Sequence, residues 1–137
     1  MTTVILDNEA VAALRDVHHP HHKRVLAFVE ANRPTNRRET GRRTVVPAAV
    51  RVEANWDRTS PAAATINRLR IEDVPLDQIG ANLAAALHDE CDVSVADAHV
   101  GATIQRQARA DDVVVITSDP GDVRLVAGSR AVRVITL

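Results

Sequence analysis

Four carboxylates are spread along the chain, each near a point where a regular element is expected to begin or end. Asp7 closes a short apolar run of β-branched residues, and Asp119 follows a second such run. Asp97 stands three residues after Ser94, the spacing of a helix capping box, and Glu53 lies within another expected helix. Taken singly, all but Asp7 have ordinary explanations, as turn, capping or exposed helix residues. Asp7 differs because the strand before it is expected to be buried.

Together, the four carboxylates indicate a particular kind of site, which none of them indicates alone. Two carboxylates about 4 Å apart repel by roughly 4 kcal/mol at an effective dielectric constant of about 20. Three or four of them at one sheet edge therefore stay ionised only if a cation holds them together. Such oxygen ligands suit Mg²⁺ or Mn²⁺, and an ion so placed can orient and activate water and offset charge on a phosphodiester.

The elements that must position these residues follow from the hydrophobic pattern. Short β-branched runs alternate with helical patterns, which predicts an α/β fold with a parallel sheet between helices. In such sheets ligands gather beyond the carboxyl ends of the strands, where Asp7 would lie. Strands are expected at 3–7, 44–46, 71–76, 113–116 and 131–136. Helices are expected at 9–16, 20–32, 48–57, 62–69, 78–91 and 95–108, and over a short segment containing Val123 and Val126.

Composition restricts the class of protein. The length of 137 residues fits a single domain, 1–137, and the net charge of −1 is not that of a protein that binds nucleic acid over its whole surface. Aromatic residues make up 1% of the chain, which argues against a base-stacking platform. The single cysteine, Cys91, cannot form an internal disulfide. With no signal-peptide pattern and no apolar run long enough to span a bilayer, a cytoplasmic protein is expected, with no membrane contact.

Two further segments allow more than one interpretation. Four histidines (His18, His19, His21 and His22) surround Pro20, and they form either a metal site or, as we prefer, a solvated helix junction, because no second cluster completes a ligand set. The Arg33–Arg43 segment contains five arginines. It is either a solvated connection or a basic flap that contacts phosphates or an acidic partner.

Four segments together resemble the motifs of PIN-domain ribonucleases. They are VILD at 4–7, VVPAAVRVE at 45–53, SVADAHVGA at 94–102 and VITSDPGDV at 115–123. The resemblance covers nearly the whole chain, and the length and layout are most similar to the VapC-type toxins of bacterial VapBC toxin–antitoxin pairs. It implies a three-layer sandwich in which a parallel sheet of about five strands is flanked by helices.

The resemblance also implies an activity and a set of partners. Asp7, Glu53, Asp97 and Asp119 would be the catalytic quartet that binds one or two Mg²⁺ or Mn²⁺ ions. Asp122 would be an occasional extra acid at the site. Thr117 would orient the site through its hydroxyl. The substrate would be RNA, such as tRNA or rRNA, a cognate VapB-type antitoxin would silence the enzyme, and a homodimer would be usual.

Three features depart from the family pattern or leave a role open. Glu9 stands where a small or hydroxyl residue is common, so that it either adds a fifth acid or points away. The Arg33–Arg43 segment is longer than the usual connection. His99 follows Asp97 by two residues and is a candidate general base, although this spacing places it on another helix face.

Two alternatives to a nuclease remain. A haloacid-dehalogenase-like phosphohydrolase also begins with a strand ending in Asp, but it needs a second Asp where Glu9 stands and a suitably placed downstream lysine. The only lysine is Lys23, in an early helix. The second alternative is a non-catalytic PIN-like interaction module, against which the intact set of four acids argues.

Overall fold

The computed structural model of the protein describes residues 1–34 and 41–137 and confirms the predicted fold class. In these residues five strands form one parallel sheet in the order β3-β2-β1-β4-β5. The strands are β1 (Thr2–Leu6), β2 (Arg42–Pro47), β3 (Glu72–Val74), β4 (Asp112–Thr117) and β5 (Arg133–Thr136).

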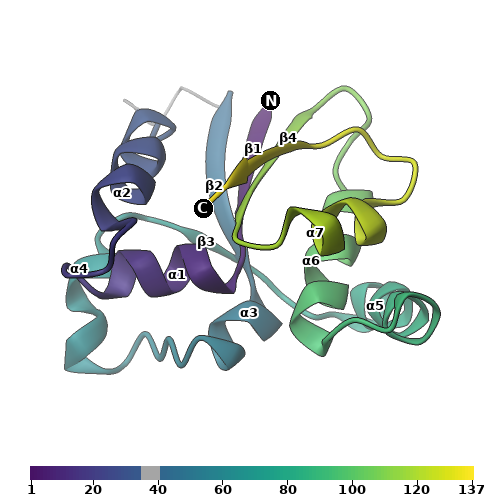
Figure 1. Cartoon of the computed structure of the whole chain (residues 1–137), viewed down its shortest axis with the longest axis horizontal. Helices are drawn as coiled ribbons and strands as arrows, with labels where there is room; N and C mark the ends of the chain where they lie inside the picture. The colour runs from purple at the N-terminus through teal and green to yellow at the C-terminus, as the bar shows by residue number, and fades with distance from the viewer. Residues whose placement is uncertain (35–40) are drawn as a thin grey trace.

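Helices lie on both faces of this sheet. They are α1 (Asn8–Arg15), α2 (His22–Ala31), α3 (Ala48–Glu53), η1 (Pro61–Ala63), α4 (Ala64–Asn67), α5 (Gln78–Cys91), α6 (Val95–Gln105) and α7 (Pro120–Ala127). Figure 1 shows α1 and α2 on one side of the strands and α6 and α7 on the other, with α5 packed outside α6. Within residues 1–34 and 41–137, every helix is too short or too polar to span a bilayer.

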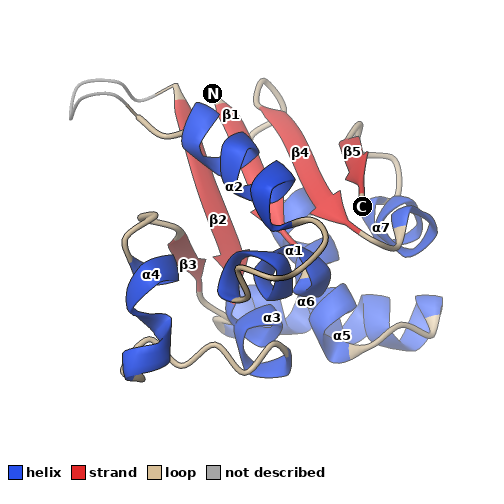
Figure 2. Ribbon diagram, turned by 60° about the vertical axis from the view of Figure 1, so that its left-hand side comes forward, coloured by secondary structure: helices blue, strands red, loops and turns tan. Residues whose placement is uncertain are grey.

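The central strand β1 fixes the architecture. Its residues Val4, Ile5 and Leu6 are fully buried, since both faces of the strand are covered by helices. β1 pairs with β2 on one side and with β4 on the other, so that the strand order changes direction here. The carboxyl ends of strands at such a switch point form the usual binding crevice of open α/β sheets. Figure 2 shows the strands pointing toward the side where α1, α3 and α6 lie.

The outer helix α5 follows its predicted apolar face except at the first position. Leu83 and Leu87 pack in a small hydrophobic cluster with the buried Ala84 and with residues of α6 and α7, whereas Ile79 is 62% exposed. The helix packs chiefly against α6 rather than against the sheet. A Cβ atom on Gly101 of α6 would come within 2.8 Å of Leu87 Cδ1 and 2.6 Å of Val126 Cβ, so that close helix contacts select small residues there.

Several element boundaries differ from the predicted ones. The helix expected at 48–57 ends at Glu53, because Asn55 adopts a left-handed conformation with φ of 56°. Pro20 lies in a turn, and the next helix begins only at His22. Of the Arg33–Arg43 segment, residues 35–40 lie outside the described part of the chain, and Arg42 and Arg43 belong to β2.

Candidate functional site

Asp7 lies directly beyond β1, at the switch point of the sheet. Its backbone N–H donates to the carbonyl of Ile116 in β4, which ties it to the neighbouring strand. One carboxylate oxygen, Oδ1, accepts the Asn8 N–H at 2.7 Å and caps α1. The residue is only 7% exposed. A buried carboxylate is thus held at the strand end by the backbone on both sides of it.

Thr117 connects Asp7 to the segment that carries Asp119. Its buried hydroxyl donates to Asp7 Oδ2 at 2.7 Å and accepts the Asp119 N–H at 2.9 Å. Asp119 in turn caps α7, because its Oδ1 accepts the Asp122 N–H at 3.3 Å. The ends of β1 and β4 are therefore joined through one hydroxyl group, and this chain of contacts brings Asp122 to the same edge.

Asp97 comes from the opposite layer. Ser94 caps α6 and accepts the Asp97 N–H at 3.1 Å, so that half of the predicted capping box is formed. The other half would be a bond from the Ser94 N–H to the Asp97 carboxylate, and none is found within residues 1–34 and 41–137. The Asp97 carboxylate is half-buried and remains available for other contacts.

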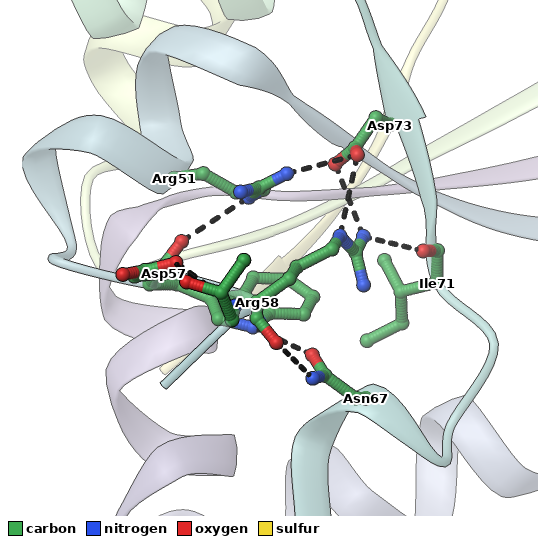
Figure 3. Close-up of polar contacts among 8 residues, drawn as sticks. Arg51, Asp57, Arg58, Asn67, Ile71 and Asp73 are labelled. Atoms are coloured by element: carbon green, nitrogen blue, oxygen red, sulfur yellow. Dashed lines mark hydrogen bonds and ion pairs between the residues drawn. The ribbon is translucent and has the colours of Figure 1, made fainter. Parts of the chain in front are cut away.

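Glu53 is the last residue of α3, and a polar cluster fixes the chain just beyond it. Figure 3 shows that Asp73 contacts both Arg51 and Arg58. Its Oδ2 accepts a hydrogen bond from Arg51 Nη1 at 2.9 Å, and its Oδ1 accepts one from Arg58 Nη2 at 3.0 Å. The Arg58 guanidinium carbon also lies 4.2 Å from the ring centroid of the buried Trp56. Although burial acts to raise the pKa of Asp73, the two arginines lower it overall. The sequence patterns did not predict this cluster. Its contacts hold the C-terminal end of α3 in position.

Neighbouring carboxylates contribute to the raised pKa values of Asp7 and Glu53. Burial raises the pKa of Asp7, and the charges of Asp97 and Asp119 add to this rise, while hydrogen bonds from Thr117 and Asn8 oppose it. Partial burial raises the pKa of Glu53, and the charges of Asp97 and Asp7 raise it further. Carboxylates from α3, α6 and the ends of β1 and β4 therefore share one electrostatic environment.

Asp122 belongs to the same environment. The adjacent Asp119 carboxylate is the main cause that raises the pKa of Asp122, followed by partial burial and by the charges of Asp97 and Asp7. No Lys, Arg or His forms an ion pair with any of these five acids in the part of the chain that the structure describes. Their negative charge is thus uncompensated within those residues.

The donor set suits a hard divalent cation. It consists of carboxylate oxygens and one hydroxyl, without sulfur or imidazole, as Mg²⁺ and Mn²⁺ prefer. Within residues 1–34 and 41–137, no three His, Cys, Asp or Glu side chains already lie in an arrangement that could hold a metal ion. The side chains of Glu53 and Asp119 are exposed.

His99 is a structural link rather than a group that faces the acids. The ring is 1% exposed, and its Nδ1 accepts the Ala49 N–H at 3.2 Å. Ala49 lies in the first turn of α3, where backbone N–H groups lack helical partners, and Pro47 provides no side-chain cap. Burial lowers the pKa of His99, which favours the neutral ring that can accept this bond. His99 therefore joins α6, which carries Asp97, to α3, which carries Glu53.

Loss of this link is expected to loosen the site. In His99→Leu the Ala49 N–H would lose its acceptor, at a cost of about 1–3 kcal/mol in stability. Metal affinity would fall about tenfold, because the two helices no longer hold Asp97 and Glu53 in register. His99→Asn keeps an acceptor near the Nδ1 position and should recover most of the affinity. Calorimetric titration with Mn²⁺ tests this, and equal affinity in the Leu variant and the wild type would contradict it.

Glu9 and the histidine turn form a separate contact. Glu9 Oε1 lies 2.6 Å from His19 Nε2, and the His21 N–H donates to His19 Nδ1 at 3.0 Å. His22 Nδ1 contacts the Ala13 carbonyl at 2.7 Å. Two of the four histidines thus hold the α1–α2 turn, and Glu9 is engaged there. No sequence signal distinguishes these histidines from the exposed His18.

An apolar hollow adjoins the acidic edge. It has a volume of about 440 Å³ and is lined by Val52, Glu53, Leu76, Val95 and neighbouring alanines. Val52 is 79% exposed and Val95 is 56% exposed. Exposed apolar side chains gathered beside a charged cluster are typical of a surface that a partner covers.

No family model matches the chain. No curated protein matches it either.

Proposed function

We propose that the protein is a Mg²⁺- or Mn²⁺-dependent endoribonuclease. The observation that supports this most strongly is the set of carboxylates at the switch point, which have no cationic partner among the described residues and among which burial and neighbouring acids raise the pKa values of Asp7, Glu53 and Asp122. Like charges gathered in this way need a cation, and a metal bound by oxygen ligands at a sheet edge suits phosphodiester hydrolysis.

Each acid has a role in this proposal. Asp7, Glu53, Asp97 and Asp119 would hold the ion, with Asp122 as a further ligand or as a partner of Asp119. When bound, the ion would supply Lewis-acid activation of water and would neutralise charge on the phosphodiester. Thr117 would keep Asp7 and the Asp119 backbone in place through its hydroxyl, which is buried and has partners on both sides.

The biological setting is proposed from the resemblance to VapC-type toxins. The enzyme would act in the cytoplasm as the toxin of a type II toxin–antitoxin pair, on RNA such as tRNA or rRNA. A VapB-type antitoxin would cover the acidic edge, and the apolar hollow beside Glu53 offers a surface for it. A homodimer would be the working form.

Cleavage of RNA by the purified protein tests the proposal. We expect discrete products with Mn²⁺ or Mg²⁺ and none with EDTA. Asp97→Asn should lower the rate by about a hundredfold or more, equivalent to roughly 3 kcal/mol of transition-state stabilisation. Asp112→Asn is the matched control, since Asp112 is exposed at the start of β4, at the other sheet edge. Metal-independent cleavage, or equal activity in the two variants, would refute the assignment.

A further inference from the structure

A basic cavity lies near the amino ends of the strands, whereas the acids lie at the carboxyl ends. It has a volume of about 610 Å³, within the range of small-molecule sites, and its polar lining includes Gln105, Gln107, Arg109, Ser129 and Arg130. These residues come from the end of α6 and from the connections that lead into β4 and β5. Such helix-to-strand connections lie at the amino ends of the strands, and Figure 1 shows the two side by side, far from α3.

Arg130 is fixed in this cavity, and no acid of the described residues forms an ion pair with it. Its Nη2 donates to the carbonyls of Ala108 at 2.7 Å and Asp111 at 2.9 Å, which anchor the guanidinium. Its Nε is buried and has no hydrogen-bond partner in residues 1–34 and 41–137. The carboxylate of Asp111, whose backbone carbonyl accepts from Arg130, contacts the Met1 amino group at 3.4 Å instead. A half-buried positive charge is therefore held in place by neutral carbonyl groups alone.

The rest of the lining complements this charge. Arg109 is exposed and forms no ion pair among the described residues, and no acid lines the cavity there. The Gln105 amide donates to the Val126 carbonyl at 2.9 Å, which orients that side chain across the cavity wall. The result is two guanidinium groups, two amides and one hydroxyl around a single hollow. Guanidinium groups bind the oxygens of phosphate through a planar array of donors.

We propose that this cavity binds the phosphate monoester group of a nucleotide, of an RNA end or of free phosphate. A monoester carries a charge of about −1.5 to −2 at neutral pH, which matches the two arginines better than the single charge of a carboxylate or a phosphodiester. The inference does not depend on nuclease activity, because it uses other residues at another edge. Its failure would leave the proposed function untouched.

Guanidinium NMR signals test the site directly. The probes are inorganic phosphate, adenosine 5′-monophosphate, adenosine, and an RNA oligonucleotide with or without a 5′-phosphate. EDTA is present so that no metal joins phosphate to the carboxylates. We expect phosphate-bearing probes to shift the Nε–H signals of Arg109 and Arg130. Arg109→Gln should weaken binding about tenfold or more. Arg68→Gln is the matched control, because Arg68 is exposed on another helix end and should bind as the wild type does.

The probes also separate the sources of the phosphate. Binding of free phosphate and the nucleotide alike would assign a free phosphate group, and tighter binding of the nucleotide would assign a mononucleotide. A preference for the 5′-phosphorylated RNA over its unphosphorylated copy would assign an RNA end. The proposal is overturned if no probe shifts the two signals, if adenosine binds as well as its monophosphate, if RNA binds regardless of its 5′-phosphate, or if Arg109→Gln binds as the wild type does.

Discussion

Replacement of Asp7 by asparagine is expected to abolish metal-dependent RNA cleavage while making the metal-free protein more stable. The variant removes a carboxylate at the centre of the acid cluster, so that the rate should fall by about a hundredfold or more. It also removes a buried charge that neighbouring acids repel. We expect the free energy of unfolding to rise by about 1 kcal/mol at neutral pH.

The pH dependence of this stability gain follows from the raised pKa of Asp7. Burial and nearby acids raise that pKa in the folded protein above its ordinary value of 3.8, so the unfolded chain releases the proton first as pH rises. The charged form therefore opposes folding, increasingly as pH rises from the ordinary value through the raised one. The gain from Asp7→Asn should disappear in acid, where Asp7 is protonated in both states.

Urea denaturation at several pH values measures this effect, with Asp112→Asn as the control for loss of an exposed acid. A variant that is less stable than the wild type at neutral pH would contradict the electrostatic account. Regulated expression gives the cellular counterpart, since only the protein with Asp7 intact should arrest growth and produce discrete new RNA ends.

Removal of the Thr117 hydroxyl is expected to have the second large effect. In Thr117→Val the Asp7 carboxylate loses a donor and the Asp119 N–H loses its acceptor. Each unsatisfied group costs about 1–3 kcal/mol when it stays buried, which gives a loss of roughly 2–6 kcal/mol in stability if both do. Loss of the bond also raises the pKa of Asp7 further, so that metal binding should need higher pH.

Thr117→Ser is the matched variant, because it keeps the hydroxyl and removes only a methyl group. Thermal unfolding and Mn²⁺ titration of both variants separate the hydrogen bonds from packing. Equal stability of the Ser and Val variants would show that the hydroxyl does not join the two strand ends.

The pattern of the chain predicted the sheet and its helices because these depend on local periodicity. The run ending at Asp7 is apolar at every position and can only be a strand covered on both faces, which made β1 recognisable. The positions of Asp97 and Asp119 near helix starts also follow from local signals, the Ser94 cap and Pro120. The approach of Asp119 to Asp7 follows from the parallel pairing of β1 and β4, which end at the same side of the sheet.

Other features depend on tertiary contacts that no local pattern encodes. The spacing of apolar residues in α5 does not show that Leu83 and Leu87 pack against α6 and α7 while Ile79 is left exposed. The N-terminus of α3 is capped by His99, fifty positions away from Ala49. A histidine near a candidate acid suggests catalysis in the sequence, and only its burial shows the structural contact.

Paramagnetic broadening by Mn²⁺ tests most directly whether distant acids share one ion. Substoichiometric Mn²⁺ should broaden the NMR signals of Asp7, Glu53, Asp97 and Asp119 together, and leave those of Arg109 and Arg130 at the opposite edge sharp. Broadening centred on the histidines at 18–22, scattered over the surface, or absent from the four acids would contradict a common metal site.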